Sequence, residues 1–313
     1  MDHDDRAQLD DLLVRAPVPT RRPTVLALEE RLFRIEPVLD HGFVRVVDYM
    51  GDDAAIVQAA RVSYGAGTRA VRDDRGLIRY LVRHRHTTPI EMCEIKFHVK
   101  LPIFVARQWI RHRTANVNEI SARYSILDRE FYLPAPADLA AQSSSNRQGR
   151  GAVLSADEAA GVLDLLRRDA STAFSTYETL LNDHGDGKPV DASAPQLARE
   201  LARMNLGLGT YTQWYWKIDL HNLFHFISLR ADPHAQLEIR RYADIIGQMV
   251  ADWVPHAWEA FVDYRLSGAV LSRAELGVVQ GLARGEPLKA LLAGSGLAAR
   301  ERREFLDKLG VEG

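Results

Sequence analysis

The sequence has almost no cysteine, since Cys93 is the single thiol in 313 residues. One thiol makes no internal disulfide and builds no multi-cysteine zinc site, so we expect a reducing, cytoplasmic setting. Long apolar runs are also missing, because no stretch approaches the roughly 18 apolar residues of a membrane span. The start of the chain lacks the basic and apolar segments of a signal peptide. These absences predict a protein that is neither exported nor embedded in a membrane.

The sequence also has little net charge. Its 40 Lys and Arg residues balance 42 Asp and Glu residues, which leaves a formal net charge of −2. Non-specific binding of a polyanion needs a surplus of Lys and Arg that displaces counterions. We therefore expect no general nucleic-acid binding, and only local basic clusters remain as sites for anions.

The hydrophobic pattern indicates an α/β fold. Polar and apolar residues alternate strictly over residues 94–100, which predicts a strand with one buried face. A second strand is predicted over residues 43–50 and a helix over residues 54–62, and Pro102 opens a helix over residues 103–111. We expect a single core domain in which helices flank a twisted mixed or antiparallel sheet.

The two ends of the chain differ from its centre. Residues 1–37 are charged and contain proline, which predicts an arm, and residues 268–313 are predicted to form a tail of short helices. We therefore expect the core domain to span residues 38–267. Inside it, the polar stretch over residues 142–151 is predicted to be a surface insertion, followed by a helical second half. Capping patterns mark expected helix starts at Ser155, Ser193, Asp232 and Ser272.

Candidate functional residues gather at the end of the helix predicted over residues 103–111. Arg107, Arg111 and Arg113 place three guanidinium groups beside His112. Because arginine binds phosphate in a bidentate manner, a phosphate-bearing ligand is the natural guest. A solvated basic helix face would be the plainer interpretation. However, amide, carboxylate, hydroxyl and guanidinium groups crowd into the next residues, 114–125, and such a loop is costly to hold without a ligand.

The spacing of these residues is similar to a known signature. Arg111, His112 and Arg113, followed after seven residues by Ser121, resemble the signature of the flavin-dependent thymidylate synthases. Residues 60–63, 84–91 and 229–239 match further stretches in the family's order. The resemblance covers residues 38 to 265, approximately. Inner positions of the signature that also match are Asn118, Glu119, Arg123 and Tyr124.

The resemblance implies an enzyme that methylates deoxyuridine monophosphate (dUMP) to thymidine monophosphate (dTMP). It implies methylene-tetrahydrofolate as carbon donor and FAD, reduced by NADPH, as hydride carrier. It also implies a homotetramer with active sites at subunit interfaces. The implied FAD contacts are Ser63, His86, Thr88, Arg111, His112, Arg113, Asn118 and Glu119. The implied dUMP contacts are Gln108, Arg111, Glu119, Ser121, Arg123, Arg203 and Arg230.

Arg230 is the residue to which the resemblance assigns catalysis. It resembles the arginine that contacts the uracil ring and favours ionisation at N3, which makes C5 a better nucleophile. The structural alternative is an arginine paired with Asp232 or Glu238. Ser121 has no obvious paired base, so we expect a ligand contact rather than a nucleophile. Cys93 lies outside the matching stretches, and we expect no catalytic thiol.

The sequence departs from the family pattern in one place. Asp219, Leu220 and His221 stand where some members have Asn-Ala-Arg, and His225 stands where those members have Asn. Asp219, His221 and His225 remain predicted FAD contacts, because carboxylate and imidazole groups also form hydrogen bonds.

Two other functions remain as alternatives. His221 and His225 are spaced i, i+4 on a predicted helix and would chelate a metal with Asp219 or His234, as in a metal-dependent hydrolase. The other alternative is a non-catalytic nucleotide-binding or RNA-binding module that uses the arginine-rich loop. The charge of −2 argues against the second. We predict an enzyme without a metal.

Overall fold

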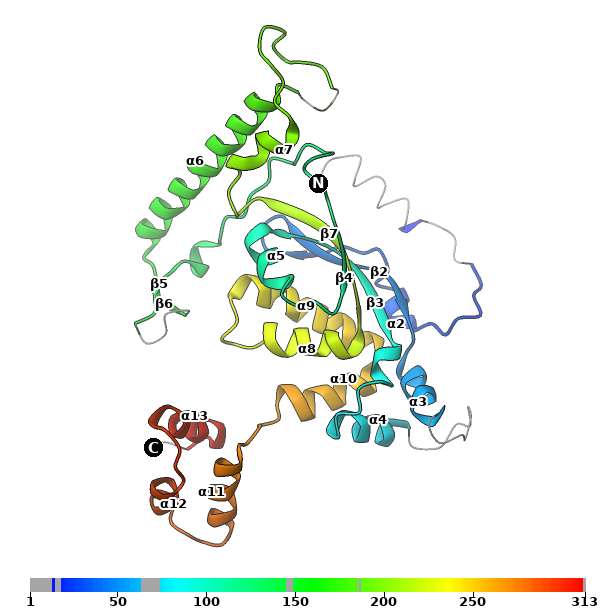
Figure 1. Cartoon of the computed structure of the whole chain (residues 1–313), viewed down its shortest axis with the longest axis vertical. Helices are drawn as coiled ribbons and strands as arrows, with labels where there is room; N and C mark the ends of the chain where they lie inside the picture. Colours follow the sequence, from blue (N-terminus) through cyan, green and yellow to red (C-terminus); the bar gives the residue numbers. More distant parts are fainter. Residues whose placement is uncertain are drawn as a thin grey trace. The chain divides into compact units, whose positions relative to one another are not determined.

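The computed structural model describes residues 13–14, 18–62, 74–144, 149–183, 185 and 187–311. The chain divides into two compact units, Met1–Glu259 and Ala260–Gly313. The larger unit combines a sheet with helices, and the smaller unit is built from short helices (Figure 1).

A five-stranded antiparallel sheet organises the larger unit (Figure 1). The strand order is β1-β2-β3-β7-β4. The central strand β3 pairs with β7 over its whole length, from Glu94 opposite Asp219 to Pro102 opposite Tyr211. The strands are β1 (Glu36–Val38), β2 (Gly42–Met50), β3 (Glu94–Pro102), β4 (Asn116–Glu119) and β7 (Tyr211–Asp219).

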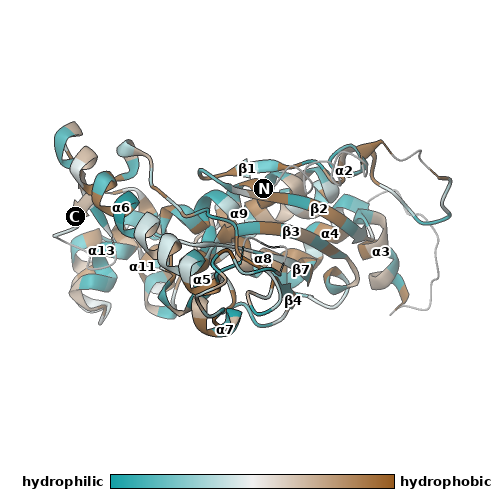
Figure 2. Ribbon diagram, turned by 90° about the horizontal axis from the view of Figure 1, so that it is seen from above, coloured by the Kyte–Doolittle hydropathy of each residue, from teal (hydrophilic) through white to brown (hydrophobic). Residues whose placement is uncertain are grey.

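One face of this sheet is apolar and covered by three helices. Ile95, Phe97 and Val99 alternate along β3 and are buried, because every second side chain of a strand points to the same face. Brown, hydrophobic segments run along β2 and β3 in Figure 2. Helix α5 contacts β3 and β7, α8 contacts β7, and α9 contacts β1 and β2. These helices are α5 (Ile103–Trp109), α8 (Leu220–Arg230) and α9 (Leu237–Trp253).

Trp109, the last residue of α5, is the centre of an aromatic cluster on the apolar face. Its ring centroid lies 5.1 Å from that of Trp216 on β7 and 4.7 Å from that of Phe226 on α8. All three side chains are buried. Burial of one such side chain contributes on the order of 2–3 kcal/mol. The cluster therefore fixes the end of α5, where the basic residues begin, against β7 and α8.

The other face of the sheet carries polar side chains. Lys100 is only 2% exposed and forms an ion pair with Glu130. On the same strand, His98 accepts a hydrogen bond at Nδ1 from Arg45 Nε at 2.9 Å, and its Nε2 lies 3.0 Å from Gln213 Oε1. Burial, and after it the charge of Arg45, lower the pKa of His98 to about 4. The imidazole is therefore neutral at pH 7 and donates from Nε2.

Shorter elements complete the larger unit, and α10 (Pro255–Phe261) spans its boundary with the smaller one. None of the helices in the described ranges combines the length and the hydropathy that a membrane crossing needs. The shorter elements are α2 (Leu26–Glu29), α3 (Asp53–Val62), α4 (Asp74–Arg83), η1 (Ile90–Met92), η2 (Pro136–Asp138), β5 (Ala140–Gln142), β6 (Arg150–Val153), α6 (Ala156–Leu181), α7 (Arg199–Ala202) and η3 (Arg203–Asn205).

The smaller unit has its own small core. Val278, Leu297 and Phe305 are buried together there. Lys308 of the last helix forms an ion pair at 2.7 Å with Glu275, the residue three positions after the Ser272 cap. The elements are η4 (Val262–Leu266), α11 (Arg273–Ala283), α12 (Leu288–Gly294) and α13 (Ala299–Leu309).

The α/β class is confirmed, together with the first strands and helices and the capping boxes at Ser155 and Ser272. Two expected helix starts are wrong. Ser193 instead donates from its hydroxyl to Asp191 in a local turn, and the next helix, α7, begins at Arg199. Asp232 accepts from the backbone N–H of His234 in another turn, so α9 begins only at Leu237.

The expectation of a helical second half is also wrong, because β7 lies there. This strand pairs with both β3 and β4 and is therefore an inner strand of the sheet. The predicted surface insertion over residues 142–151 contains part of a hairpin, in which β5 and β6 form a two-stranded sheet of their own.

Candidate active site

Three of the predicted site residues, Gln108, His112 and Arg230, come together where α5 and α8 end. After Trp109 the chain turns, and His112 N donates to Trp109 O at 3.0 Å. Arg230 ends α8, and its Nε donates to His112 Nε2 at 3.0 Å. Its Nη2 donates to the main-chain oxygen of Gln108 at 3.4 Å. The side chain of Arg230, from the downstream matching stretch, thus contacts His112 and Gln108 of the basic segment.

This contact fixes the protonation of His112. A ring nitrogen that accepts from arginine carries no proton, so the proton of the ring lies on Nδ1. Burial, followed by the charges of Arg230 and His225, lowers the pKa of His112 from 6.5 to about 4. Burial also lowers the pKa of Arg230, but a guanidinium stays charged at neutral pH. The site therefore combines the guanidinium of Arg230, which is oriented by its hydrogen bond to His112, with a neutral His112 ring that donates through Nδ1.

The alternative pairing of Arg230 with a nearby carboxylate is wrong. Asp232 accepts from the backbone N–H of His234 at 2.7 Å, and Glu238 forms an ion pair with Arg150 at 2.5 Å. Arg230 contacts His112 instead. Its charge is therefore not neutralised by either of those carboxylates.

Three further predicted arginines are exposed. In the part of the chain that the structure describes, Arg111, Arg113 and Arg203 form no hydrogen bond or ion pair through their side chains. Guanidinium groups without a carboxylate partner attract phosphate, which they bind through paired N–H donors. Arg111 and Arg113 follow α5 directly, whereas Arg203 begins η3.

The residues after the basic loop lie along β4. Glu119 accepts a hydrogen bond from Thr212 Oγ1 at 2.6 Å. Asn118 and Glu119 both line a pocket of about 440 Å³, together with Gln213 and Tyr215 of β7. A volume of this size suits a small-molecule ligand.

Ser121 and Arg123 are held by local contacts. Ser121 Oγ accepts from the backbone N–H of Arg123 at 3.3 Å. The side chain of Arg123 forms an ion pair with Glu200 of α7 at 2.9 Å, and both side chains are about half exposed. Exposed pairs of this kind are weak, typically below about 1 kcal/mol. Arg123 is therefore free to exchange Glu200 for an anionic ligand at little cost.

The start of α8 contains the residues that depart from the family pattern. Asp219 caps the helix, because it accepts from the backbone N–H of Asn222 at 2.9 Å and from its side chain at 2.6 Å. Asn222 Oδ1 in turn accepts from Thr114 Oγ1 at 2.8 Å, which ties the basic loop to α8. One turn further along, the ring of His225 lies 5.7 Å from that of His112. His221 follows Asp219 in the first turn of this helix.

The metal-site alternative finds no support in this arrangement. Among the described residues, no three His, Cys, Asp or Glu side chains are grouped so that they could hold a metal ion. Asp219 is engaged as a helix cap, and His234 lies beside Asp232 instead of the other two histidines.

Some predicted flavin contacts lie on a neighbouring segment. His86 and Thr88 are exposed and precede η1, and η1 contacts both α8 and β7. The ring of His86 stacks on Tyr80 with centroids 5.7 Å apart. Ser63 lies outside the described residues.

The single thiol is inaccessible. Cys93 is fully buried, and burial, with the charges of Asp52 and Asp53, raises the pKa of its thiol to about 12. The nucleophile and the metal ligand formed by cysteine is the thiolate. Cys93 therefore stays protonated and has no access to a ligand.

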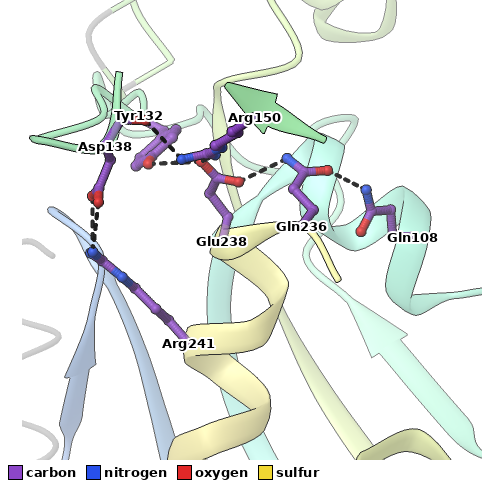
Figure 3. A network of polar contacts seen from close by, with 7 residues as sticks. All are labelled: Gln108, Tyr132, Asp138, Arg150, Gln236, Glu238 and Arg241. Atoms are coloured by element: carbon purple, nitrogen blue, oxygen red, sulfur yellow. Dashed lines mark hydrogen bonds and ion pairs between the residues drawn. The ribbon is translucent and has the colours of Figure 1, made fainter. Parts of the chain in front are cut away.

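A chain of polar contacts around Gln108 was not foreseen from the sequence (Figure 3). The side chain of Gln108 donates to Gln236, and Gln236 Nε2 donates to Glu238 Oε2 at 2.9 Å. Glu238 is only 3% exposed. It also accepts from Arg150 at 2.5 Å and from Tyr132 at 3.1 Å. The buried carboxylate thus links the predicted nucleotide residue Gln108 to the β5–β6 hairpin.

Comparison with known proteins identifies relatives for nearly the whole chain. Residues 45–256 match the family described as thymidylate synthase complementing protein. A flavin-dependent thymidylate synthase from Ruegeria pomeroyi is 60% identical over 292 residues, which is 93% of each chain. One from Gluconobacter oxydans is 63% identical over 289 residues, or 92% of each chain.

Solved structures show the same fold. A UMP/dUMP methylase, PolB from Streptomyces cacaoi, bound with 5-Br UMP, is 35% identical and superimposes with a TM-score of 0.64. That match covers 74% of this chain and 98% of the methylase. A second structure of the same methylase, bound with 5-Br dUMP, is 33% identical with a TM-score of 0.62 and covers 73% of this chain and 97% of that one.

Proposed function

The chain belongs to the thymidylate synthase complementing protein family, and we propose that it methylates dUMP to dTMP at the site around Arg230, with FAD as its flavin. The names of its relatives and the nucleotides bound to the related methylase support this reaction. In the chain itself, the supporting observation is the contact of Arg230 with His112, which holds a cation beside the basic loop.

The nucleotide phosphate is bound by exposed arginines in this proposal. Arg111 and Arg203 carry guanidinium groups without a carboxylate partner in the described chain, and Arg123 has only an exposed one. A phosphate with two negative charges outcompetes a solvated carboxylate for such groups, because its bonds to arginine are charge-assisted. Ser121, and Glu119 at the end of β4, contribute neighbouring hydrogen-bonding groups.

The uracil ring is activated by Arg230. When N3–H ionises, negative charge spreads over the ring carbonyl oxygens and C5, and a guanidinium beside them stabilises that charge. His112 orients this guanidinium by accepting at Nε2. With His112 neutral, Arg230 keeps its full positive charge for the substrate. C5 then bonds to the methylene carbon of the folate and loses its own proton, while the bonds from that carbon to the folate nitrogens break and release tetrahydrofolate. No covalent bond to the protein is needed.

The donor set of the chain fits a flavin nucleotide. Guanidinium groups at Arg111 and Arg113 suit a diphosphate, and the Nδ1–H of His112 is an additional donor. His86, Thr88, Asn118, Ser63, His221 and His225 are further candidates for contact with FAD. Asp219 is a weaker candidate, because both of its oxygens already accept from Asn222. Held by these residues and reduced by NADPH, FAD would supply the hydride that converts the transferred carbon into a methyl group.

A thymidylate synthase without a reactive cysteine is consistent with the state of Cys93. A thiol with a pKa of about 12 does not form the thiolate that would attack C6 of the base. Activation of the base by a cation and a flavin requires no such nucleophile. The buried thiol therefore supports this route over one that depends on cysteine.

Methylene-tetrahydrofolate as the carbon donor, NADPH as the reductant and cytoplasmic residence belong to the same proposal. So does a homotetramer with shared active sites.

Absorption spectroscopy tests the proposal. The purified protein should show a flavin band, and anaerobic NADPH should bleach this band faster when dUMP is present. Addition of methylene-tetrahydrofolate should then restore the band and yield dTMP. A colourless protein that binds metal and hydrolyses a substrate would refute the proposal. Tight dUMP binding without turnover in the complete mixture would instead indicate a binding module.

A further inference from the structure

The amide of Gln108 is the end of a hydrogen-bond chain that begins at a buried carboxylate (Figure 3). Glu238 lies at the start of α9 and is 3% exposed. Arg150 at 2.5 Å provides its counter-charge, and Tyr132 donates to the same oxygen at 3.1 Å. A carboxylate that is buried and paired with arginine is ionised, and it then accepts hydrogen bonds only.

The carboxylate of Glu238 determines the direction of each hydrogen bond in this series. Gln236 contacts Glu238 Oε2 at 2.9 Å and must donate to it through its NH₂ group. The amide oxygen of Gln236 therefore faces the other way, toward Gln108. Gln108 in turn must present its own NH₂ group to Gln236. Its carbonyl oxygen is then turned away from Gln236 and left as an acceptor.

The same residue lies within the candidate active site. The main-chain oxygen of Gln108 accepts from Arg230 Nη2 at 3.4 Å. An acceptor fixed at this place does not suit an ionised phosphate, which has no proton to donate. It does not suit the uracil N3 either, because an oxygen facing N3 would oppose the ionisation that Arg230 favours. A hydroxyl of the sugar is the remaining donor on the nucleotide.

We propose that Gln236 is a positioning residue that holds the amide of Gln108 in one orientation, so that Gln108 accepts a hydrogen bond from the 3′-hydroxyl of the nucleotide sugar. This inference rests on the proposed function, because it takes dUMP as the ligand. It adds a role for Gln236 and Glu238, and it assigns the contact of Gln108 to the sugar instead of the phosphate.

Substitution of Gln236 by Met tests the role. Methionine has a similar length and no amide, and position 236 is exposed, so the fold should be kept. Titration of the FAD-loaded protein with dUMP should show a Kd raised about fivefold to tenfold, which corresponds to one lost hydrogen bond. Flavin content should not change. Arg241→Met is the matched control, since it breaks an ion pair with Asp138 at 2.9 Å beside this chain of bonds but outside it.

A double-mutant cycle separates positioning from general packing. Gln108→Met should weaken dUMP binding to a similar extent, and adding Gln236→Met to that variant should change the Kd by less than twofold. If the two losses add fully, Gln236 acts independently of Gln108 and the inference is wrong.

A nucleotide without the 3′-hydroxyl tests whether Gln108 recognises that hydroxyl. In the unmodified protein, 2′,3′-dideoxyuridine monophosphate should bind about fivefold to tenfold more weakly than dUMP. Gln236→Met should bind both nucleotides equally. Equal binding of both by the unmodified protein overturns the inference, and this measurement needs no variant to fold. If the unmodified protein neither binds nor converts dUMP, the proposed function falls as well. If it converts dUMP but Gln236→Met keeps its discrimination, only the inference falls.

Discussion

The free energy of unfolding at acidic pH should depend on two histidines that accept hydrogen bonds from arginines. Arg45 Nε donates to His98 Nδ1 at 2.9 Å, and Arg230 Nε donates to His112 Nε2 at 3.0 Å. Burial is the larger cause and the neighbouring cations the smaller one in lowering the pKa of each ring to about 4. The folded chain therefore keeps both rings neutral where the unfolded chain does not.

The sign of the effect follows from proton uptake. Between pH 6.5 and pH 4 the unfolded chain binds protons on these rings and the folded chain does not, so the free energy of unfolding decreases as the pH falls. Each pKa unit corresponds to about 1.4 kcal/mol, which limits each ring to about 3 kcal/mol. Because both rings are only partly buried and water screens them, we expect about 2 kcal/mol for the pair between pH 7 and pH 5.

Urea unfolding at several pH values measures this loss. All five tryptophans lie within residues 1–259, so their fluorescence reports the larger unit alone. His98→Asn and His112→Gln each keep an acceptor for the arginine without a group that titrates, and together they should flatten the dependence between pH 7 and pH 5. The exposed His234, changed to Asn, is the control and should leave it in place. Equal slopes in the double variant and the unmodified protein would refute the reasoning.

Three further substitutions have definite expected outcomes. Cys93→Ala should keep dTMP synthesis within about twofold, because the thiol is buried and protonated; a folded but inactive variant would contradict this. Arg230→Ala should retain FAD, seen in its absorption spectrum, yet lose dTMP formation at least about 100-fold, and full activity would exclude the proposed role. Glu130→Gln should lower the free energy of unfolding by about 3 kcal/mol, because it leaves the Lys100 ammonium buried, with Asp128 at 3.8 Å as its remaining carboxylate among the described residues. Asp128→Asn should cost less than about 1 kcal/mol in the same urea titration, and equal losses in the two variants would contradict the assignment.

Much of the fold could be predicted where the sequence pattern is local. The alternation in β3 is visible because its outward residues, such as Lys96 and His98, are polar and its inward residues are apolar. The capping boxes at Ser155 and Ser272 also depend only on residues three positions apart. Strand β7 was missed for the opposite reason. Its buried Trp214 and Trp216 flank Tyr215, which is exposed, so aromatic side chains occupy both faces and hide the period of two.

The contents of the site could be predicted better than its contacts. His112 is predicted from the basic segment and Arg230 from the family resemblance, but their hydrogen bond joins positions 118 residues apart. Only the packing of α5 and α8 against β7 brings them together. The bond between Gln108 and Gln236 spans 128 residues and was missed for the same reason. In contrast, the capping of α8 by Asp219 is local, and its bond to Asn222 could have been expected from the two residues alone.

The two arginine–histidine pairs also show why residue type alone does not determine chemistry. Arg45 occupies Nδ1 of His98, so that ring donates from Nε2, toward Gln213. Arg230 occupies Nε2 of His112, so this ring donates from Nδ1. The first pair contributes to the stability of the sheet, whereas the second belongs to the proposed active site. His98→Asn should therefore alter stability below pH 6.5, while His112→Gln should also alter turnover at pH 7, because it removes the Nδ1 donor.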